Sequence, residues 1–171
     1  MRIFLIGFTA SGKTTIGKQL AGKLGLTFFD IDQYIEKKFD KPVSTIFSER
    51  GESHLRLLEM TALHSLLFKP DFVLSTGGGT PCFYDNMRRM NNNGITIYLE
   101  ASVDELFSRL KNDLGNRPLL QVKTEDALKQ FIEINLANRK IFYEKAHIRI
   151  SSSSIDINKI VDQIRDFQKP E

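Results

Sequence analysis

Short apolar runs alternate with longer amphipathic stretches along most of the chain. Apolar runs bounded by turn residues are typical of buried strands, whereas apolar residues at three- and four-residue spacing indicate helices. The predicted strands are 2–6, 26–29, 72–74, 95–99 and 147–150. The predicted helices are 12–24, 31–39, 44–68, 83–93, 102–111, 124–145 and 155–167. Because strands and helices alternate, we expect an α/β fold in three layers, with a central, mainly parallel five-stranded sheet flanked by helices.

Local signals refine the helix boundaries. Helix 44–68 is interrupted near Arg50-Gly51, and Ser102 with Glu105 predicts a capping box at the start of the fifth helix. Segment 112–123 breaks the helical pattern, so we expect an exposed loop there. In helix 124–145, the residues expected to face inward are Leu128, Phe131, Ile134, Ile141 and Phe142.

The segment Gly7–Thr14 follows the first predicted strand and fits G-x-x-x-x-G-K-[ST] at every required position. Its glycines let the backbone bend so that successive N–H groups point inward, and the helix that follows adds the positive end of its dipole. Lys13 is expected to reach the β- and γ-phosphates, and the Thr14 hydroxyl to bind Mg²⁺. A glycine-rich turn without a ligand is the alternative. The strand before the motif and the helix after it favour nucleotide binding.

Composition narrows the class of protein. The 171 residues are 41% hydrophobic and 26% charged, typical of a single globular domain, and no linker divides residues 1–171. The net charge of +3 is a mild bias without a basic and aromatic cluster, so we expect no nucleic-acid partner. No apolar run approaches membrane-spanning length and no signal peptide is visible. One cysteine fits a reducing compartment, so we expect a cytoplasmic protein. No exposed apolar seam is evident, so a monomer is the default expectation.

Two carboxylates follow the second predicted strand. Asp30 and Asp32 are two residues apart at the end of that strand, so we expect both side chains to point to the same side. In parallel sheets that end is where ligands bind. The pair could assist Mg²⁺ and orient an acceptor hydroxyl. The alternative is that Asp30 only caps the following helix.

Other candidate residues are ambiguous by spacing alone. Gly77-Gly78-Gly79 follows the third strand and indicates either a close approach to the backbone or a turn that needs positive φ. Arg56 and Glu59 lie one helical turn apart and could form an ordinary surface pair. Arg139, late in a helix, and Arg117, in the loop, could simply face solvent.

Taken together, these residues resemble the shikimate kinases of the phosphate-loop kinase superfamily, over nearly the whole chain. The resemblance rests on the phosphate loop, Phe29-Asp30-Ile31-Asp32, Gly51-Glu52 with Arg56 and Glu59, Thr76-Gly77-Gly78-Gly79, Arg117-Pro118-Leu119-Leu120, and Arg139 followed by Tyr143 and Ala146. Each later motif is weak alone, but their joint occurrence in this order is specific. Leu55 departs from the family, which usually has phenylalanine before the arginine, and Thr80-Pro81 and Thr14 are also less common choices.

The resemblance implies an ATP-dependent enzyme that phosphorylates the 3-hydroxyl of shikimate on the route to chorismate and the aromatic amino acids. It implies Asp32 as the residue that binds the reacting hydroxyl and acts as general base, with Lys13 and Arg117 assisting the transfer. It implies Mg²⁺ held by Thr14 and Asp30, and shikimate held by Asp32, Arg56, Gly78 and Arg139. The implied nucleotide contacts are Ala10, Ser11, Gly12, Lys13, Thr14, Thr15, Arg109 and Arg117. The resemblance also implies that Arg117 belongs to a mobile lid at about 112–123.

Two other functions are consistent with the phosphate loop. A gluconate-type kinase shares the loop but is expected to lack the arginine pair at Arg56 and Arg139. A GTP-dependent switch needs N-K-x-D for guanine, and Asn158-Lys159-Ile160-Val161 fails at the fourth position because Asp162 is one residue late. Adenine is therefore favoured.

Overall fold

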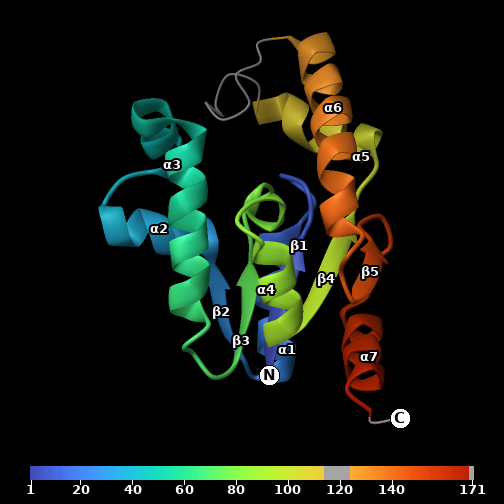
Figure 1. Ribbon diagram of the computed structural model, residues 1–171. Coiled ribbons are helices and arrows are strands. Elements are labelled where there is room, and N and C mark those ends of the chain that lie inside the picture. The colour runs from blue at the N-terminus through green and yellow to red at the C-terminus, as the bar shows by residue number, and fades with distance from the viewer. Residues whose placement is uncertain (114–123, 170–171) are drawn as a thin grey trace.

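A computed structural model describes residues 1–113 and 124–169 (Figure 1). Its strands are β1 (Arg2–Ile6), β2 (Thr27–Asp30), β3 (Phe72–Ser75), β4 (Ile95–Glu100) and β5 (Ile148–Ser151). They form one sheet in the order β2-β3-β1-β4-β5, and every neighbouring pair is parallel. The predicted α/β class and five-stranded sheet are confirmed.

Helices connect successive strands. They are α1 (Lys13–Leu24), α2 (Ile31–Phe39), α3 (Val43–Leu66), α4 (Asn86–Asn93), α5 (Val103–Leu110), α6 (Glu125–Tyr143) and α7 (Ile157–Phe167), with 3₁₀ turns η1 (Thr80–Cys82) and η2 (Lys111–Asp113). The interruption expected near Arg50-Gly51 is a kink within α3, where Gly51 has φ 79° and ψ 175°. The capping box of Ser102 and Glu105 is present at the start of α5.

Two hydrophobic cores lie on opposite faces of the sheet. Alternate residues of β1 divide between them, because successive side chains of a strand point to opposite faces. Ile3 and Leu5 pack with α1 and α7 in one core. Phe4 and Ile6 pack with α2, α3, α4, α5 and α6 in the other. The sheet is thus the middle of three layers, as expected.

The inward face of α6 differs from the one predicted. Ile134 and Ile141 are 53% and 62% exposed. Leu128 is buried as predicted, and Phe131 packs partly buried against the core. The other buried residues are Ile132 and Tyr143, whose spacing from Leu128 follows the helical repeat along one side. Ile134 and Ile141 were wrongly placed because they are apolar, although they lie off that stripe.

The strand order fixes where a ligand can bind. β1 lies between β3 and β4. The chain first builds β2 and β3 on one side of β1, then crosses over and builds β4 and β5 on its other side. The carboxyl end of such a strand faces a crevice between oppositely directed connections. Gly7–Thr14 lies there.

Within the described residues, no helix is long and apolar enough to span a membrane. The expected lid, 112–123, lies outside them from residue 114 onward.

Candidate active site

The phosphate loop connects β1 to α1 by a bend that requires glycine. Gly7 has φ 144°, and a Cβ there would lie 2.7 Å from the Leu99 carbonyl oxygen and 2.9 Å from Ser11 Oγ. Gly12 precedes α1 with φ 100° and supplies no side-chain cap to the first turn. The first turn of α1 therefore meets the loop without a competing side-chain acceptor, which is the arrangement that binds phosphate at a helix N-terminus.

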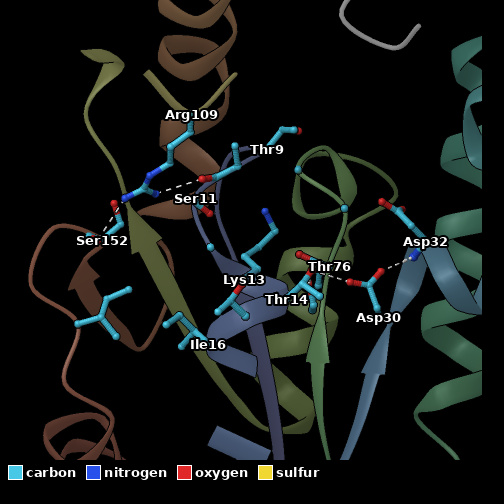
Figure 2. Close-up of a pocket in the computed structure, with 17 residues that line it drawn as sticks. Thr9, Ser11, Lys13, Thr14, Ile16, Asp30, Asp32, Thr76, Arg109 and Ser152 are labelled. Carbon is cyan, nitrogen blue, oxygen red and sulfur yellow. Dashed lines mark hydrogen bonds between the residues drawn. The ribbon is translucent and has the colours of Figure 1, made fainter. Parts of the chain in front are cut away.

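A pocket of about 570 Å³ opens over this loop (Figure 2). It is lined by Thr9, Ala10, Ser11, Gly12, Lys13, Thr14, Thr15, Ile16, Asp30, Asp32, Ser75, Thr76, Gly77, Gly78, Arg109, Ser152 and Ile155. All the loop residues predicted to contact a nucleotide are among them. The Ser11 hydroxyl is fully buried and has no hydrogen-bond partner within the described part of the chain. An acceptor such as a phosphate oxygen would satisfy it.

Lys13 is a buried cation in the wall of this pocket. Its Nζ donates to the carbonyl oxygens of Phe8 (2.7 Å) and Gly7 (3.0 Å). Burial lowers the pKa of the ammonium to about 8, although the nearby carboxylates of Asp32 and Asp30 act in the opposite direction. Lys13 therefore stays mainly charged at neutral pH, as phosphate binding requires.

Thr14 and Asp30 meet at the point where Mg²⁺ was expected. Thr14 Oγ1 donates to Asp30 Oδ2 at 2.8 Å, and Ser75 Oγ lies 3.3 Å from Thr14 Oγ1. These are hard oxygen donors beside a phosphate cradle, which suits a cation that keeps several waters and phosphate ligands. The described residues contain no cluster of three or more His, Cys, Asp or Glu, so an all-protein metal cage is absent from that part of the chain.

Asp30 caps α2, as the second alternative for this residue predicted. Its Oδ1 accepts from the backbone N–H of Asp32 (3.1 Å) and Gln33 (3.4 Å), while Oδ2 accepts from Thr14. The two oxygens serve different partners. The cap thereby fixes the direction in which the other oxygen points.

Asp32 reaches the pocket from α2, not from the end of a strand. β2 ends at Asp30, and Asp32 lies in the first helical turn, so the premise of two carboxylates on one strand was wrong. Both side chains nevertheless line the same pocket. Burial, followed by the negative charges of Glu59 and Asp30, raises the pKa of Asp32 to about 7. A carboxyl with this pKa can accept a proton near neutral pH.

Arg56 and Glu59 form a buried ion pair rather than a surface one. Arg56 is 8% exposed and Glu59 2%. Arg56 Nη1 donates to Glu59 Oε2 (2.8 Å), while Nη2 (2.8 Å) and Nε (3.2 Å) donate to Glu52 Oε1. Within residues 1–113 and 124–169, three of the five guanidinium N–H groups are engaged in this way, and one on Nη1 and one on Nη2 have no acceptor there. That remainder matches the two oxygens of a carboxylate.

Two of the three consecutive glycines, Gly77 and Gly79, make room for this ion pair. A Cβ at Gly77 would overlap Glu59 Oε1, and a Cβ at Gly79 would overlap the Arg56 guanidinium. A Cβ at Gly78 would lie 3.2 Å from the Thr9 backbone nitrogen. None of the three has positive φ. Close approach, not turn geometry, is therefore the reason for glycine here.

Arg139 lies on the same side of the pocket as Gly78. Its Nη1 is 3.4 Å from the position of a Gly78 Cβ, and its Cζ lies 5.3 Å from the centre of the Phe8 ring. Tyr143, one turn further along α6, donates from its hydroxyl to the Gly78 carbonyl oxygen at 2.5 Å. This hydrogen bond connects α6 to the glycine segment that follows β3, next to Thr9 of the phosphate loop.

Arg109 lies at the opposite end of the pocket. Its Nη1 donates to the Ala10 carbonyl oxygen (3.1 Å) and its Nη2 to that of Ser152 (3.4 Å) (Figure 2). Ile155 lines the pocket nearby. Arg117, predicted for the lid, lies outside the described residues.

Sequence reasoning missed several residues that line the pocket, among them Thr9, Ser75, Ser152 and Ile155. Ser75 could have been found, because it directly follows predicted strand 72–74, as Gly7 and Asp30 directly follow predicted strands 2–6 and 26–29. Ser152 and Ile155 carried no such signal, because they reach the pocket only when β5 pairs with β4.

Residues 9–169 match the family model described as shikimate kinase. The chain belongs to the shikimate kinase family. A shikimate kinase from Parabacteroides distasonis is 46% identical over 90% of this chain and 89% of its own length.

Solved structures agree with this family. Shikimate kinase from Bacteroides thetaiotaomicron has a TM-score of 0.88 and 42% identity over 98% of this chain and 97% of its own. Shikimate kinase from Acinetobacter baumannii in complex with shikimate has a TM-score of 0.84 and 33% identity over 99% and 95%. A gluconokinase from Sinorhizobium meliloti is similar in fold alone, at 14% identity, a TM-score of 0.57 and coverage of 95% and 88%. The expected family, and with it a kinase, is confirmed.

Proposed function

We propose that the protein transfers the γ-phosphoryl group of ATP to the 3-hydroxyl of shikimate, on the route to chorismate. The observation that carries this proposal is the pair of N–H groups left on the Arg56 guanidinium, which lies against Gly79, the neighbour of the pocket residue Gly78. They suit a carboxylate on the acceptor molecule. A phosphate cradle alone would identify only the donor.

On the donor side, the backbone of Ala10–Thr15 and the Ser11 hydroxyl bind the phosphates. Lys13 neutralises charge on the β- and γ-phosphates, and Arg109 lies against the adenine. The first turn of α1 has no side-chain cap, which supports this role. The loop holds the donor still while the acceptor approaches, so the reaction becomes effectively intramolecular.

Thr14 and Asp30 hold Mg²⁺, with Asp30 acting through water. Bound there, the ion neutralises charge on the phosphate oxygens and fixes their position. A hydrogen bond between Thr14 and Asp30 fixes the two side chains relative to each other. Asp30 also accepts hydrogen bonds from two backbone N–H groups, which fix its orientation further.

On the acceptor side, Arg56 and Arg139 bind the shikimate carboxylate and the Gly78 backbone contacts the ring hydroxyls. Asp32 accepts a hydrogen bond from the reacting hydroxyl and takes its proton as the phosphoryl group arrives. The pKa of about 7 supports this role, because the carboxylate is both available and basic at neutral pH.

An assay of ADP release with shikimate or gluconate as acceptor tests this function. We expect turnover with shikimate, and a product whose phosphate is on the 3-oxygen. Turnover with gluconate alone would overturn the proposal. Titration with ATP and GTP provides a second check, because a preference for GTP would contradict adenine binding.

We further propose that residues 1–171 form one kinase domain, that 112–123 is a lid and that Arg117 closes on the phosphates. We also propose a cytoplasmic monomer whose partners are shikimate and ATP, with no nucleic acid. Lid closure would exclude water that otherwise competes as acceptor. Size-exclusion chromatography with light scattering tests the monomer, and a stable dimer would contradict it.

A further inference from the structure

Arg56 contacts an aromatic ring as well as two carboxylates. Its Cζ lies 5.0 Å from the centre of the Phe83 ring, within the range of a cation–π interaction. Phe83 itself is 38% exposed, so hydrophobic burial explains this aromatic side chain only in part. Glu52 and Glu59 fix the edges of the guanidinium through hydrogen bonds. Phe83 adds an aromatic contact that hydrogen bonds do not supply.

The backbone that presents Phe83 is anchored to the glycines beneath Arg56. In η1, the Thr80 N–H donates to the Gly77 carbonyl oxygen (3.1 Å) and the Cys82 N–H to that of Gly79 (2.9 Å). The Asn86 side chain is fully buried and donates to the Thr80 carbonyl oxygen (3.0 Å). Segment 80–86 is therefore tied at both ends, with Phe83 at its middle.

The same segment holds an unfavourable backbone conformation. Tyr84 and Asp85 have φ of 50° and 60°, the left-handed region that bulky residues rarely adopt. The Asn86 N–H donates to the Phe83 carbonyl oxygen (3.0 Å) and closes the turn. Such conformations persist where the surrounding structure imposes them, and they gather at functional sites. Here the strained turn directly follows the residue that contacts Arg56.

We propose that Phe83 is a positioning residue for the acceptor: its ring, presented by segment 80–86, holds the Arg56 guanidinium in the orientation that receives the carboxylate of shikimate. This inference rests on the proposed function, because it assigns the carboxylate of shikimate to Arg56. Phe83 acts through Arg56 and takes no part in phosphoryl transfer.

The contact with Phe83 matters because the Arg56 side chain must be held in one conformation to bind a carboxylate. The guanidinium leaves two N–H groups for the acceptor, and they bind both carboxylate oxygens only in one plane. A ring against the guanidinium restricts rotation out of that plane. A carboxylate that meets a preorganised fork loses less free energy to ordering. The effect falls on acceptor affinity and leaves the phosphate loop unchanged.

Replacement of the ring tests the proposal. Phe83→Leu and Phe83→Met keep an apolar side chain without a ring, and two variants guard against a folding defect in either. We expect the KM for shikimate to rise about two- to fivefold, with kcat and the KM for ATP unchanged. Phe83→Tyr keeps the ring and is expected to restore the KM for shikimate.

The matched control is Phe68→Leu, the same substitution at a 90% exposed phenylalanine just beyond α3. We expect wild-type kinetics from it. The proposal is overturned if the ring-free variants keep the wild-type KM for shikimate, if both KM values rise together, or if Phe83→Tyr is impaired equally. Absence of turnover of shikimate by the wild-type protein would instead reject the proposed function, so the two failures are distinct.

Discussion

Arg56 and Glu59, three residues apart on α3, form an ion pair that is almost fully removed from solvent. The pair lies against Gly77 and Gly79, where side chains would overlap it. Burial raises the pKa of Glu59, although Arg56 opposes this shift. Burial would lower the pKa of Arg56, but Glu59 and Glu52 outweigh it and raise the pKa. The guanidinium is therefore permanently charged and fixed in direction, as a receptor for an anion should be.

Arg56→Ala should raise the KM for shikimate far more than the KM for ATP, because it removes the proposed carboxylate receptor. It also leaves Glu59 buried without its cation, so we expect a loss of about 3 kcal/mol in the free energy of unfolding. Steady-state kinetics and urea denaturation measure the two effects. A larger change in the KM for ATP would reassign Arg56 to the donor side.

Gly79→Ala should act like a partial loss of Arg56. The new Cβ would overlap the guanidinium, so the side chain must move and the KM for shikimate should rise about tenfold or more. Gly22→Ala is the matched control, because nothing lies within 4 Å of a Cβ there. In helix α1 that change should leave kinetics unchanged and stabilise the fold by about 0.5–1 kcal/mol. Equal kinetics in both variants would contradict the role of Gly79.

Asp32→Asn should lower kcat by about 10²–10⁴-fold, because the amide cannot accept the hydroxyl proton. The amide keeps nearly the same size and the phosphate loop is untouched, so ATP affinity should remain close to that of the wild type. Rapid-quench kinetics and ATP titration separate the two quantities. Wild-type turnover would remove Asp32 from the chemistry.

The pH dependence of kcat/KM should be bell-shaped. Burial raises the pKa of Asp32 to about 7, so its base form is lost as the pH falls below 7. Burial lowers the pKa of Lys13 to about 8, so its charge is lost as the pH rises above 8. Activity should therefore peak between these values. The residual activity of Asp32→Asn should lack the acidic limb, and an acidic limb of unchanged position would assign it to another group.

Arg117→Ala should reduce kcat by about 10³-fold, the lower end of the range for arginine fingers, because Lys13 and Mg²⁺ already neutralise much of the charge. The KM values should change much less. Single-turnover kinetics at saturating ATP and shikimate measure the effect. An unchanged kcat would leave the lid as a simple cover.

Local sequence patterns were enough to predict the strands, the helices and the phosphate loop. Strand and helix positions followed from hydrophobic periodicity, which depends on local spacing. Gly7–Thr14 was recognisable because its function lies in one continuous backbone segment. The capping box of Ser102 and Glu105 is equally local.

The arrangement of the proposed acceptor side depends on contacts between segments that are distant in the sequence. Spacing could not tell whether Arg56 and Glu59 pair at the surface, because their burial depends on η1 and the glycines packing against α3. The purpose of Gly77-Gly78-Gly79 was ambiguous for the same reason, since the overlapping groups come from another element. Ile134 and Ile141 were predicted to be buried because they are apolar, yet both are exposed. Apolar character alone does not determine which side of α6 packs against the core. Contacts between distant segments are set by packing, which no single stretch of sequence encodes.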